Sequence, residues 1–161
     1  MAQTVIPQRM TAQLDGDFIV FLIGMRINKP WKLWSWWPVF SAMRSLVKEL
    51  DANPQLGCLG YTFGWPVIVQ YWRSFDDLES YAKAGDRLHL PAWRRFNRVV
   101  ANARDEVGIW HETFHIAAGA YESVYSGMPP FGLGRAGRLV PATGHRETAR
   151  QRMNSAADAI G

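Results

Sequence analysis

His89 is the residue of this sequence whose position points most directly to chemistry. It stands immediately before Leu90 and Pro91, between two segments with helical periodicity, so it lies where a helix is expected to begin. The partial positive charge of a helix N-terminus disfavours protonation of an imidazole there. A neutral imidazole can bind a metal or a haem iron, or act as a general base. The alternative is a histidine that only caps a helix or sits at a kink.

A second pair of histidines lies in Val107–Ile116, whose alternating pattern predicts a strand. His111 and His115 are four residues apart, so they face the same side of that strand together with Thr113. The residues that face the other side are Trp110, Glu112 and Phe114. His111 can therefore reach a pocket or fix an interface, and the sequence leaves open which side of the strand faces a cavity.

Arg26 is a charged residue at the end of an otherwise apolar segment, Phe18–Ile27. A buried arginine needs an acidic partner, and Glu112 on another predicted strand is the obvious one. We expect an ion pair at the end of the sheet. The alternative is a clamp for a carboxylate or a haem propionate, since a guanidinium binds such groups with two parallel hydrogen bonds.

Familiar nucleotide, metal and nucleophile motifs are missing from the sequence. There is no P-loop, no HExxH and no cysteine cluster, and the single Cys58 shows no sign of activation. The segment 132–137, GLGRAG, matches GxGxxG in letters only, because no strand is expected before it and no helix after it. Nucleotide-dependent and zinc-dependent enzymes are therefore not indicated.

Length and composition describe one ordinary globular domain with extensions. The chain has 161 residues, 48% of them hydrophobic, and no apolar run reaches the roughly 18 residues of a membrane span. No secretory leader is evident, so we expect a cytoplasmic protein without a membrane partner. The net charge is +4, and +3 of it falls from Gly132 onward, where five arginines oppose Glu147 and Asp158. Because the excess lies in this tail, no nucleic-acid partner is expected.

The order of predicted elements is strand, helix, strand, strand, helix, strand. After the first strand, an apolar stripe predicts a helix that ends near Asn53 and becomes regular near or after Pro38, with 31–37 as an entry segment. A hairpin of strands 57–63 and 67–72 follows. Ser74 and Asp77 have capping-box spacing at the start of the second helical region, which resumes at 91–102 before the last strand.

This order is that of an α+β, ferredoxin-like split βαβ unit, with both helices on one face of an antiparallel sheet. The other face must be covered, and one copy of the chain offers only its tails for that purpose. We therefore expect a homodimer in which two sheets pack face to face as a dimeric α/β barrel. The expected organisation is an N-terminal arm at 1–17, the barrel domain at 18–126 and a Gly/Pro-rich basic tail at 127–161.

Four blocks of the sequence carry a family resemblance. They are FLIGMRINKPWK at 21–32, VQYWRSFDDLESYA at 69–82, HLPAWRRFN at 89–97 and VGIWHETF at 107–114. The chain resembles, from about Thr11 to Pro130, the monooxygenase-like domain family that includes a domain of fumagillin biosynthesis. That family is similar to the antibiotic-biosynthesis monooxygenases of the dimeric α/β-barrel superfamily.

The resemblance implies two kinds of site. Haem-binding members of the superfamily often hold the iron through a histidine on the second helix, a position that His89 matches here. Cofactor-independent members hold an aromatic or polyketide substrate between sheet and helices, with Trp, Asn or His assisting. The candidates are His111 and Asn97 for catalysis, and Arg26, Trp72, Trp93 and Trp110 around the cofactor.

The expected function is that of a monooxygenase-type oxidoreductase. It would act on a small apolar organic substrate in an aromatic-lined pocket, with haem held by His89, and the protein would supply the ligand, the orientation and a dry cavity. Three alternatives stay open: a cofactor-independent oxygenase, a haem-dependent lyase of the aldoxime-dehydratase type, and a protein that binds haem or a small molecule without turnover.

Overall fold

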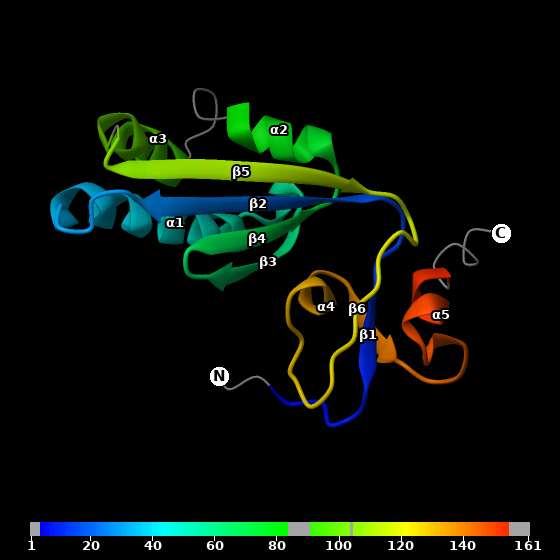
Figure 1. The fold of residues 1–161 in the computed structure, drawn as a ribbon. Helices are drawn as coiled ribbons and strands as arrows, with labels where there is room; N and C mark the ends of the chain where they lie inside the picture. The colour runs from blue at the N-terminus through cyan, green and yellow to red at the C-terminus, as the bar shows by residue number, and fades with distance from the viewer. Residues whose placement is uncertain (1–3, 84–90, 104, 155–161) are drawn as a thin grey trace.

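A four-stranded antiparallel sheet forms the centre of the main domain in the computed structural model, which describes residues 4–83, 91–103 and 105–154. Its strands are β2 (Phe18–Ile27), β3 (Cys58–Gly64), β4 (Val67–Trp72) and β5 (Val107–Ile116), in the spatial order β3-β4-β2-β5 (Figure 1). The first and third of these strands along the chain are central and the other two are at the edges. This is the arrangement of a split βαβ unit, so the α+β, ferredoxin-like fold is confirmed.

The three main helices are α1 (Leu33–Ala52), α2 (Phe75–Lys83) and α3 (Pro91–Ala103) (Figure 1). Helix α1 begins earlier than the sequence indicated. A regular helix was expected only near or after Pro38, but α1 begins at Leu33 and this proline lies inside it. Proline in a helix removes one backbone hydrogen bond. Four fully buried side chains follow within the next two turns, and their burial favours continuing the helix through the proline. They are Val39, Ala42, Met43 and Leu46.

The core lies between the sheet and these helices. The register pairs Ile23 of β2 with Ile68 of β4 and His111 of β5, so these three residues share one face of the sheet. Ile23 and Ile68 are buried in a cluster with the apolar face of α1, which identifies this face as the one covered by helices. Odd-numbered residues of β2 and β5 therefore point toward the helices, and even-numbered residues point to the open face.

Ser74 caps α2 as its spacing predicted. Its hydroxyl oxygen accepts a hydrogen bond from the backbone N–H of Asp77 at 3.1 Å, and the hydroxyl donates to the Asp77 carboxylate at 2.9 Å. Arg73 also donates two hydrogen bonds to that carboxylate. These contacts lower the pKa of Asp77, mainly through the hydrogen bonds from Arg73. The second helical region is therefore fixed at its start, next to the end of β4.

The two ends of the chain meet in a small second unit. Here β1 (Met10–Gln13) pairs with β6 (Arg138–Pro141), next to α4 (Leu133–Ala136), the short 3₁₀ turn Gly144–Arg146 and α5 (Ala149–Asn154) (Figure 1). The sequence suggested a solvated extension for the C-terminal tail. The described part of that tail is instead folded, because it pairs with a strand that precedes the main domain.

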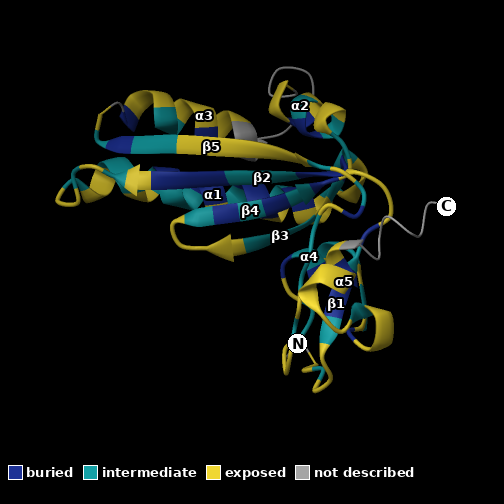
Figure 2. Cartoon of the chain, turned by 45° about the vertical axis from the view of Figure 1, so that its right-hand side comes forward, coloured by how far each residue is buried: buried dark blue, intermediate teal, exposed yellow. Residues whose placement is uncertain are grey.

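The small unit also covers part of the open face of the sheet. Gly60 of β3 lies so close to α4 that an added Cβ would stand 3.1 Å from the Cα of Ala136, and Gly132 approaches the hydroxyl of Tyr71 in the same way. On the β2–β5 half of this face, Phe18 at the start of β2 is buried against Tyr121, whereas exposed residues run along β5 (Figure 2). One copy of the chain therefore covers the β3–β4 half of its own open face.

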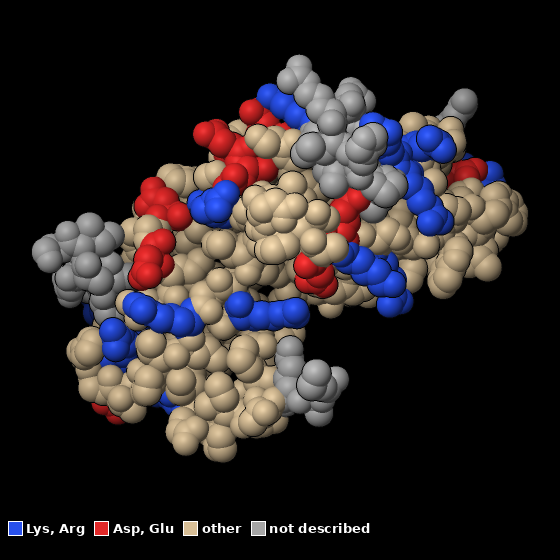
Figure 3. Space-filling view, turned by 180° about the vertical axis from the view of Figure 1, so that it is seen from behind, with Lys and Arg blue, Asp and Glu red and all other residues tan. Residues whose placement is uncertain are grey.

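Charge is distributed unevenly over the surface of the main domain. Seen from behind, basic side chains gather over part of the helical side, next to an end of the molecule that carries few charges (Figure 3). Within the described residues, α3 has three arginines and no acidic side chain. No helix in the described ranges is both long enough and apolar enough to span a bilayer.

Candidate functional site

His111 lies on the helix-facing side of β5, on a part of the strand that the helices leave exposed. It is opposite Ile23 in the register, and its ring centroid is 5.6 Å from that of Phe21, the neighbouring helix-facing residue of β2. Thr113 follows two residues later on the same side, opposite Phe21, and is also exposed. The three side chains form a small strip, with an imidazole, a hydroxyl and an aromatic ring, that is open to a ligand.

His115 is on the same face but has a different role. Its Nε2 lies 3.3 Å from the carboxylate of Asp17, just before β2 begins, and both side chains are largely exposed. Asp17 also accepts a hydrogen bond from the backbone N–H of Ala118. His115 therefore helps to join the end of β5 to the start of β2, and it provides a natural comparison for His111.

Trp72, a candidate for the cofactor environment, is completely buried in the core. Its ring is 5.3 Å from the ring of Tyr81, and its Nε1 donates a 2.9 Å hydrogen bond to the side-chain oxygen of Gln70, which is also buried. The indole N–H and the amide thus satisfy each other in an apolar environment. This placement gives Trp72 a packing role, and none of the cavities described below reaches it.

The other helical candidates are only partly described. Asn97 is exposed on α3, beside the buried Phe96, and no hydrogen bond joins it to His111. Trp93 lies in the first turn of α3, with a side chain outside the described residues. His89 also lies outside the described residues, in the segment between α2 and α3. The role expected for His89 therefore stays a prediction.

The expected ion pair between Arg26 and Glu112 is wrong. Both residues are on the open face of the sheet, but Arg26 is opposite Gly108 and Glu112 is opposite Leu22. Four residues along a strand separate these positions by about 13 Å. Arg26 is exposed at the end of β2, and no ion pair links it to Glu112 in the described structure. The error arose because side chains on neighbouring strands meet only if the register aligns them.

Trp110 faces the open side, away from His111. It lies against Gly24, its partner across the β2–β5 pair, and it is partly exposed together with Phe114. Trp110 and His111 therefore cannot line one cavity within a single copy of the chain. A pocket between the sheet and the helices would be lined by the face of β5 that carries His111, and not by the face that carries Trp110.

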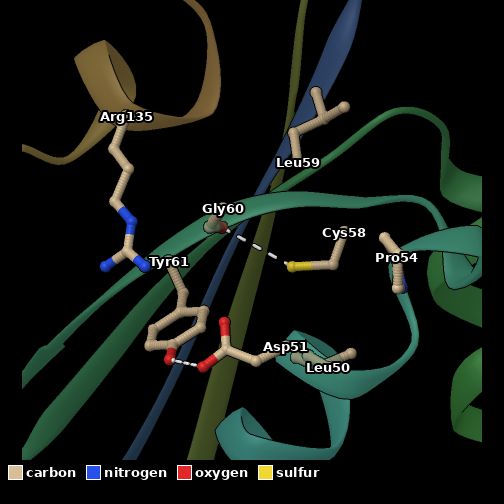
Figure 4. A pocket seen from close by; sticks show the side chains of 8 residues that line it. All are labelled: Leu50, Asp51, Pro54, Cys58, Leu59, Gly60, Tyr61 and Arg135. Atoms are coloured by element: carbon tan, nitrogen blue, oxygen red, sulfur yellow. Dashed lines mark hydrogen bonds between the residues drawn. The ribbon is translucent and has the colours of Figure 1, made fainter. Parts of the chain in front are cut away.

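A small cavity of about 150 Å³ lies at the β3 edge of the sheet (Figure 4). The Tyr61 hydroxyl donates a hydrogen bond to the carboxylate of Asp51, at the C-terminal end of α1, and the guanidinium of Arg135 lies 5.6 Å from the Tyr61 ring. Burial of the phenol, followed by its hydrogen bond to Asp51, raises the pKa of Tyr61 to about 12. The phenol thus remains a hydrogen-bond donor over the physiological range.

Cys58 lies in the same cavity but is not an activated nucleophile. Its Sγ is 3.6 Å from the carbonyl oxygen of Gly60, and burial raises the pKa of the thiol to about 11. A thiol that stays protonated is a poor nucleophile and metal ligand. With its phenol, guanidinium and carboxylate, this cavity can orient a small polar group, and its thiol does not supply a nucleophile.

Sequence reasoning missed this cavity because its parts are far apart in the chain. Asp51 ends a helix, Tyr61 alternates normally in a strand, and Arg135 comes from the segment that was expected to be an extension. Only the folding of the tail against β3 brings Arg135 to the other two residues. No local pattern in the sequence signals that contact.

A larger, open hollow lies at the beginning of α1. It has a volume of about 670 Å³ and is lined almost entirely by apolar side chains. Its lining residues are Leu33, Trp34, Trp36, Trp37 and Pro38. This is the aromatic-lined hollow of the described structure, but it lies outside the layer between sheet and helices and contains none of the predicted catalytic residues.

The described residues do not by themselves build a haem site or a metal centre. No group of three His, Cys, Asp or Glu side chains in the described ranges is arranged to hold a metal. A haem needs an axial ligand and an apolar chamber, whereas the space around Trp72 is filled by Leu78 and Tyr81. Of the predicted haem contacts, Arg26 and Trp110 lie on the opposite face of the sheet from His111.

Comparison with known sequences agrees with this architecture. A sequence model of the family described as Monooxygenase af470-like matches residues 18–133, which contain the whole four-stranded sheet and its three helices. The chain belongs to the Monooxygenase af470-like family. The match ends before Arg135, so the cavity at the β3 edge combines residues inside and outside the matched region.

One relative is the protein named Monooxygenase af470 from Aspergillus fumigatus. It is 30% identical to this chain over an alignment 158 positions long, and the match covers 81% of this chain and 54% of that protein. The chain thus spans about half the length of this curated relative. No solved structure matches the chain.

Proposed function

We propose that this protein is an oxidoreductase of the monooxygenase type that acts on a small apolar organic substrate. The observation that carries the proposal is the strip formed by the exposed His111 and Thr113 of β5 and the half-buried Phe21 of β2, on the helix-facing side of the sheet, in a chain that belongs to a family of monooxygenase-like proteins. The ring of Phe21 offers an apolar surface to a flat substrate. The imidazole and the hydroxyl beside it supply polar groups that can orient the substrate.

His111 is the proposed proton acceptor at this site. In its neutral form an imidazole can remove a proton from an acidic C–H or O–H group of a bound substrate, which produces the electron-rich species that reacts with oxygen. The Thr113 hydroxyl, on the same side of the strand, can donate a hydrogen bond to a substrate oxygen. Both groups are held by a strand that pairs with β2 along its whole length, so their spacing is fixed.

Haem held by His89 is the cofactor part of the proposal. When bound, haem would supply the activation of oxygen. The test is a visible spectrum of the purified chain after addition of haemin. A Soret band that is lost in His89→Ala and kept in His145→Ala, a variant of an exposed histidine in the C-terminal unit, supports this assignment. A chain that takes up no haemin, or a band that survives His89→Ala, contradicts it.

A cofactor-independent reaction is the alternative, and the exposure of His111 favours it because a base is already present without haem. In the simplest balanced form, a substrate methylene group reacts with one O₂ to give a carbonyl group and one water. The substrate supplies all four electrons, so no external reductant is required. Activity of a haem-free preparation in the presence of chelators would support this form of the proposal.

The experiment that tests the site measures oxygen uptake and the incorporation of ¹⁸O from labelled O₂, over a panel of aromatic and polyketide-like substrates. His111→Ala should lose about 10²-fold or more in rate if the imidazole is the base. His115→Ala, four residues away on the same strand face, should retain the rate. Equal rates in the two variants would contradict the assignment. Formation of a nitrile from an aldoxime would indicate a lyase, and tight binding without any product would indicate a binding protein.

A homodimer is part of the same proposal. The uncovered half of the open face contains the partly exposed side chains of Trp110 and Phe114, next to the half-buried Leu22 of β2. Packing of a second copy on this half would remove apolar surface from water and complete a two-sheet barrel. Light scattering should give the mass of a dimer, and Phe114→Glu should give a monomer. A monomeric wild-type chain would contradict this part of the proposal.

A further inference from the structure

Four tryptophans are exposed at one end of the main domain. Trp31 and Trp34 are 72% and 71% exposed, and Trp37 and Trp65 are more than half exposed. Three of them come from the entry to α1 and one from the turn between β3 and β4, and Phe40 links the two segments by ring contacts with Trp37 and Trp65. We call these four tryptophans, with Leu33, the aromatic end. Such a group of large apolar side chains in contact with water marks an interaction surface.

Tryptophan is the side chain most suited to the boundary between lipid and water. Its ring is apolar and its N–H needs a polar partner, so indoles gather at the level of the lipid headgroups. The aromatic end consists of a loop, a first helical turn and a hairpin turn, which can enter a soft layer together. The apolar hollow between Trp34, Trp36 and Trp37 adds space for an acyl chain.

The charges next to the aromatic end favour an anionic surface. Along α1, the exposed side chains of Trp34, Trp37, Arg44 and Lys48 follow one another on one face at helical spacing. With the rise of a helix, Arg44 lies about 10 Å beyond Trp37. This is close to the thickness of the headgroup layer plus the reach of an arginine side chain. The guanidinium can therefore contact headgroups while the indoles lie below them.

Neighbouring residues strengthen this charge pattern. The adjacent helix α3 adds Arg95 and Arg98, both exposed and without an ion pair in the described part of the chain. The two acidic residues that follow α3 are neutralised, because Asp105 pairs with Lys29 and Glu106 pairs with Lys32. Seen from behind, blue side chains gather on the helical side of the main domain, next to an end that is largely tan (Figure 3). A second copy of the chain would bring like charges together, so it fits this end poorly.

We propose that the aromatic end is a docking site for an anionic lipid bilayer, in which the tryptophans enter the headgroup boundary and Arg44, Lys48, Arg95 and Arg98 contact anionic headgroups. This is attachment to one membrane surface and does not require a spanning helix. It modifies the expectation from the sequence that the protein has no membrane partner, which rested on the lack of a spanning segment. A surface-bound chain would meet apolar substrates where they dissolve best.

The first test is co-sedimentation of the full chain with phosphatidylcholine vesicles, with and without about 30% phosphatidylserine. The wild-type chain should bind the anionic vesicles, and Trp34→Ser/Trp37→Ser should weaken this binding about tenfold or more. Phe75→Ser, which removes a half-exposed aromatic ring from the start of α2, is the matched control and should bind like wild type. Circular dichroism of each variant establishes that its fold is retained.

The second test separates the electrostatic contribution from the aromatic one. Arg44→Gln/Lys48→Gln should weaken binding to the anionic vesicles by roughly fivefold for each charge removed, with little effect on neutral vesicles. Lack of binding to anionic vesicles overturns the proposal. Binding that the tryptophan pair does not affect also overturns it. A change from oligomer to monomer in the tryptophan variant, without any vesicle binding, would show that the aromatic end joins copies of the chain instead.

Discussion

The indole of Trp110 lies directly against Gly24, its cross-strand partner on the open face of the sheet. A Cβ added at Gly24 would stand 2.6 Å from two atoms of that ring, closer than any normal contact. The missing side chain at Gly24 therefore leaves the space that Trp110 fills. The pair keeps this part of the open face flat, as a surface that packs against another sheet must be.

Gly24→Ala should displace this indole. We expect a loss of about 1 kcal/mol in the free energy of unfolding, at the lower end of the range for overpacking because Trp110 is partly exposed and can move. Urea unfolding measures the loss, and tryptophan fluorescence reports the displaced ring.

Gly108→Ala is the matched control for this prediction, since it is on the same face of the β2–β5 pair and its added Cβ would meet nothing closer than 3.8 Å. Adding Trp110→Ala to Gly24→Ala should remove the clash. If Gly24→Ala and Gly108→Ala had equal stability, the close contact would not matter to the fold.

Ser74→Ala should remove the cap of α2. The backbone N–H of Asp77 loses its acceptor, and the expected cost is about 1 kcal/mol in the free energy of unfolding. Urea unfolding of this variant is compared with Ser80→Ala, an exposed serine inside the same helix. A larger loss from Ser80→Ala than from Ser74→Ala would contradict the capping assignment.

The strands could be predicted well because their side-chain pattern is local. The predicted limits are correct for two strands, Phe18–Ile27 and Val107–Ile116. The alternation in the second strand correctly placed His111 and Trp110 on opposite faces of the sheet. Features that depend on register or on distant segments could not be read in this way. The Arg26–Glu112 pair failed for the first reason, and the pairing of β1 with β6 was missed for the second.

In the candidate site, too, local features could be predicted from the sequence and features that depend on the register could not. The sequence identified His111 and its neighbours on the strand, since period-two alternation places them on one face. It did not identify the contact of His111 with Phe21, which depends on the β2–β5 register. Trp72 was expected near a cofactor, but its alternation with Gln70 and Ile68 only shows that it faces the core, and the structure fills that space with other side chains.

The loss of stability between neutral pH and acid should depend on Glu106. Hydrogen bonds from Lys32 and then from Ser35 lower the pKa of this carboxyl below its usual value of 4.5. The ionised form is thus favoured by folding, so its contribution is present above pH 4.5 and is lost as the pH falls through the lowered pKa.

The measurement for Glu106 is urea unfolding of wild type and Glu106→Gln between pH 7 and pH 2. Wild type should be more stable at neutral pH, and the two curves should converge in acid. Glu79→Gln, in an exposed pair with Lys83, is the control. A gap between wild type and Glu106→Gln that stayed constant with pH would contradict the assignment.

Cys58 should react slowly with a thiol reagent in the folded protein. With its pKa raised to about 11 from the ordinary 9.0, the thiolate fraction at pH 8 falls about a hundredfold. Reaction with a disulfide reagent such as dithionitrobenzoate should be correspondingly slow, and should speed up when urea unfolds the same chain. Equal rates for the folded and unfolded chain would show that burial does not protect this thiol.

Arg152 holds the C-terminal helix α5 to the rest of the second unit. The residue is only 6% exposed, its Nε donates a 2.7 Å hydrogen bond to Glu122, and its Nη1 donates to the backbone carbonyls of Glu147 and Arg146. Arg152→Gln would leave a carboxylate and two carbonyls without these donors, which is costly in a site with little access to water. We expect α5 to undock while the main domain stays folded, because the four-stranded sheet does not include this segment.

Limited proteolysis with chymotrypsin, which does not cleave after arginine, measures this undocking. The C-terminal unit of Arg152→Gln should be cut faster than that of the exposed control Arg150→Gln. Equal cleavage of the two variants would show that Arg152 does not hold the helix.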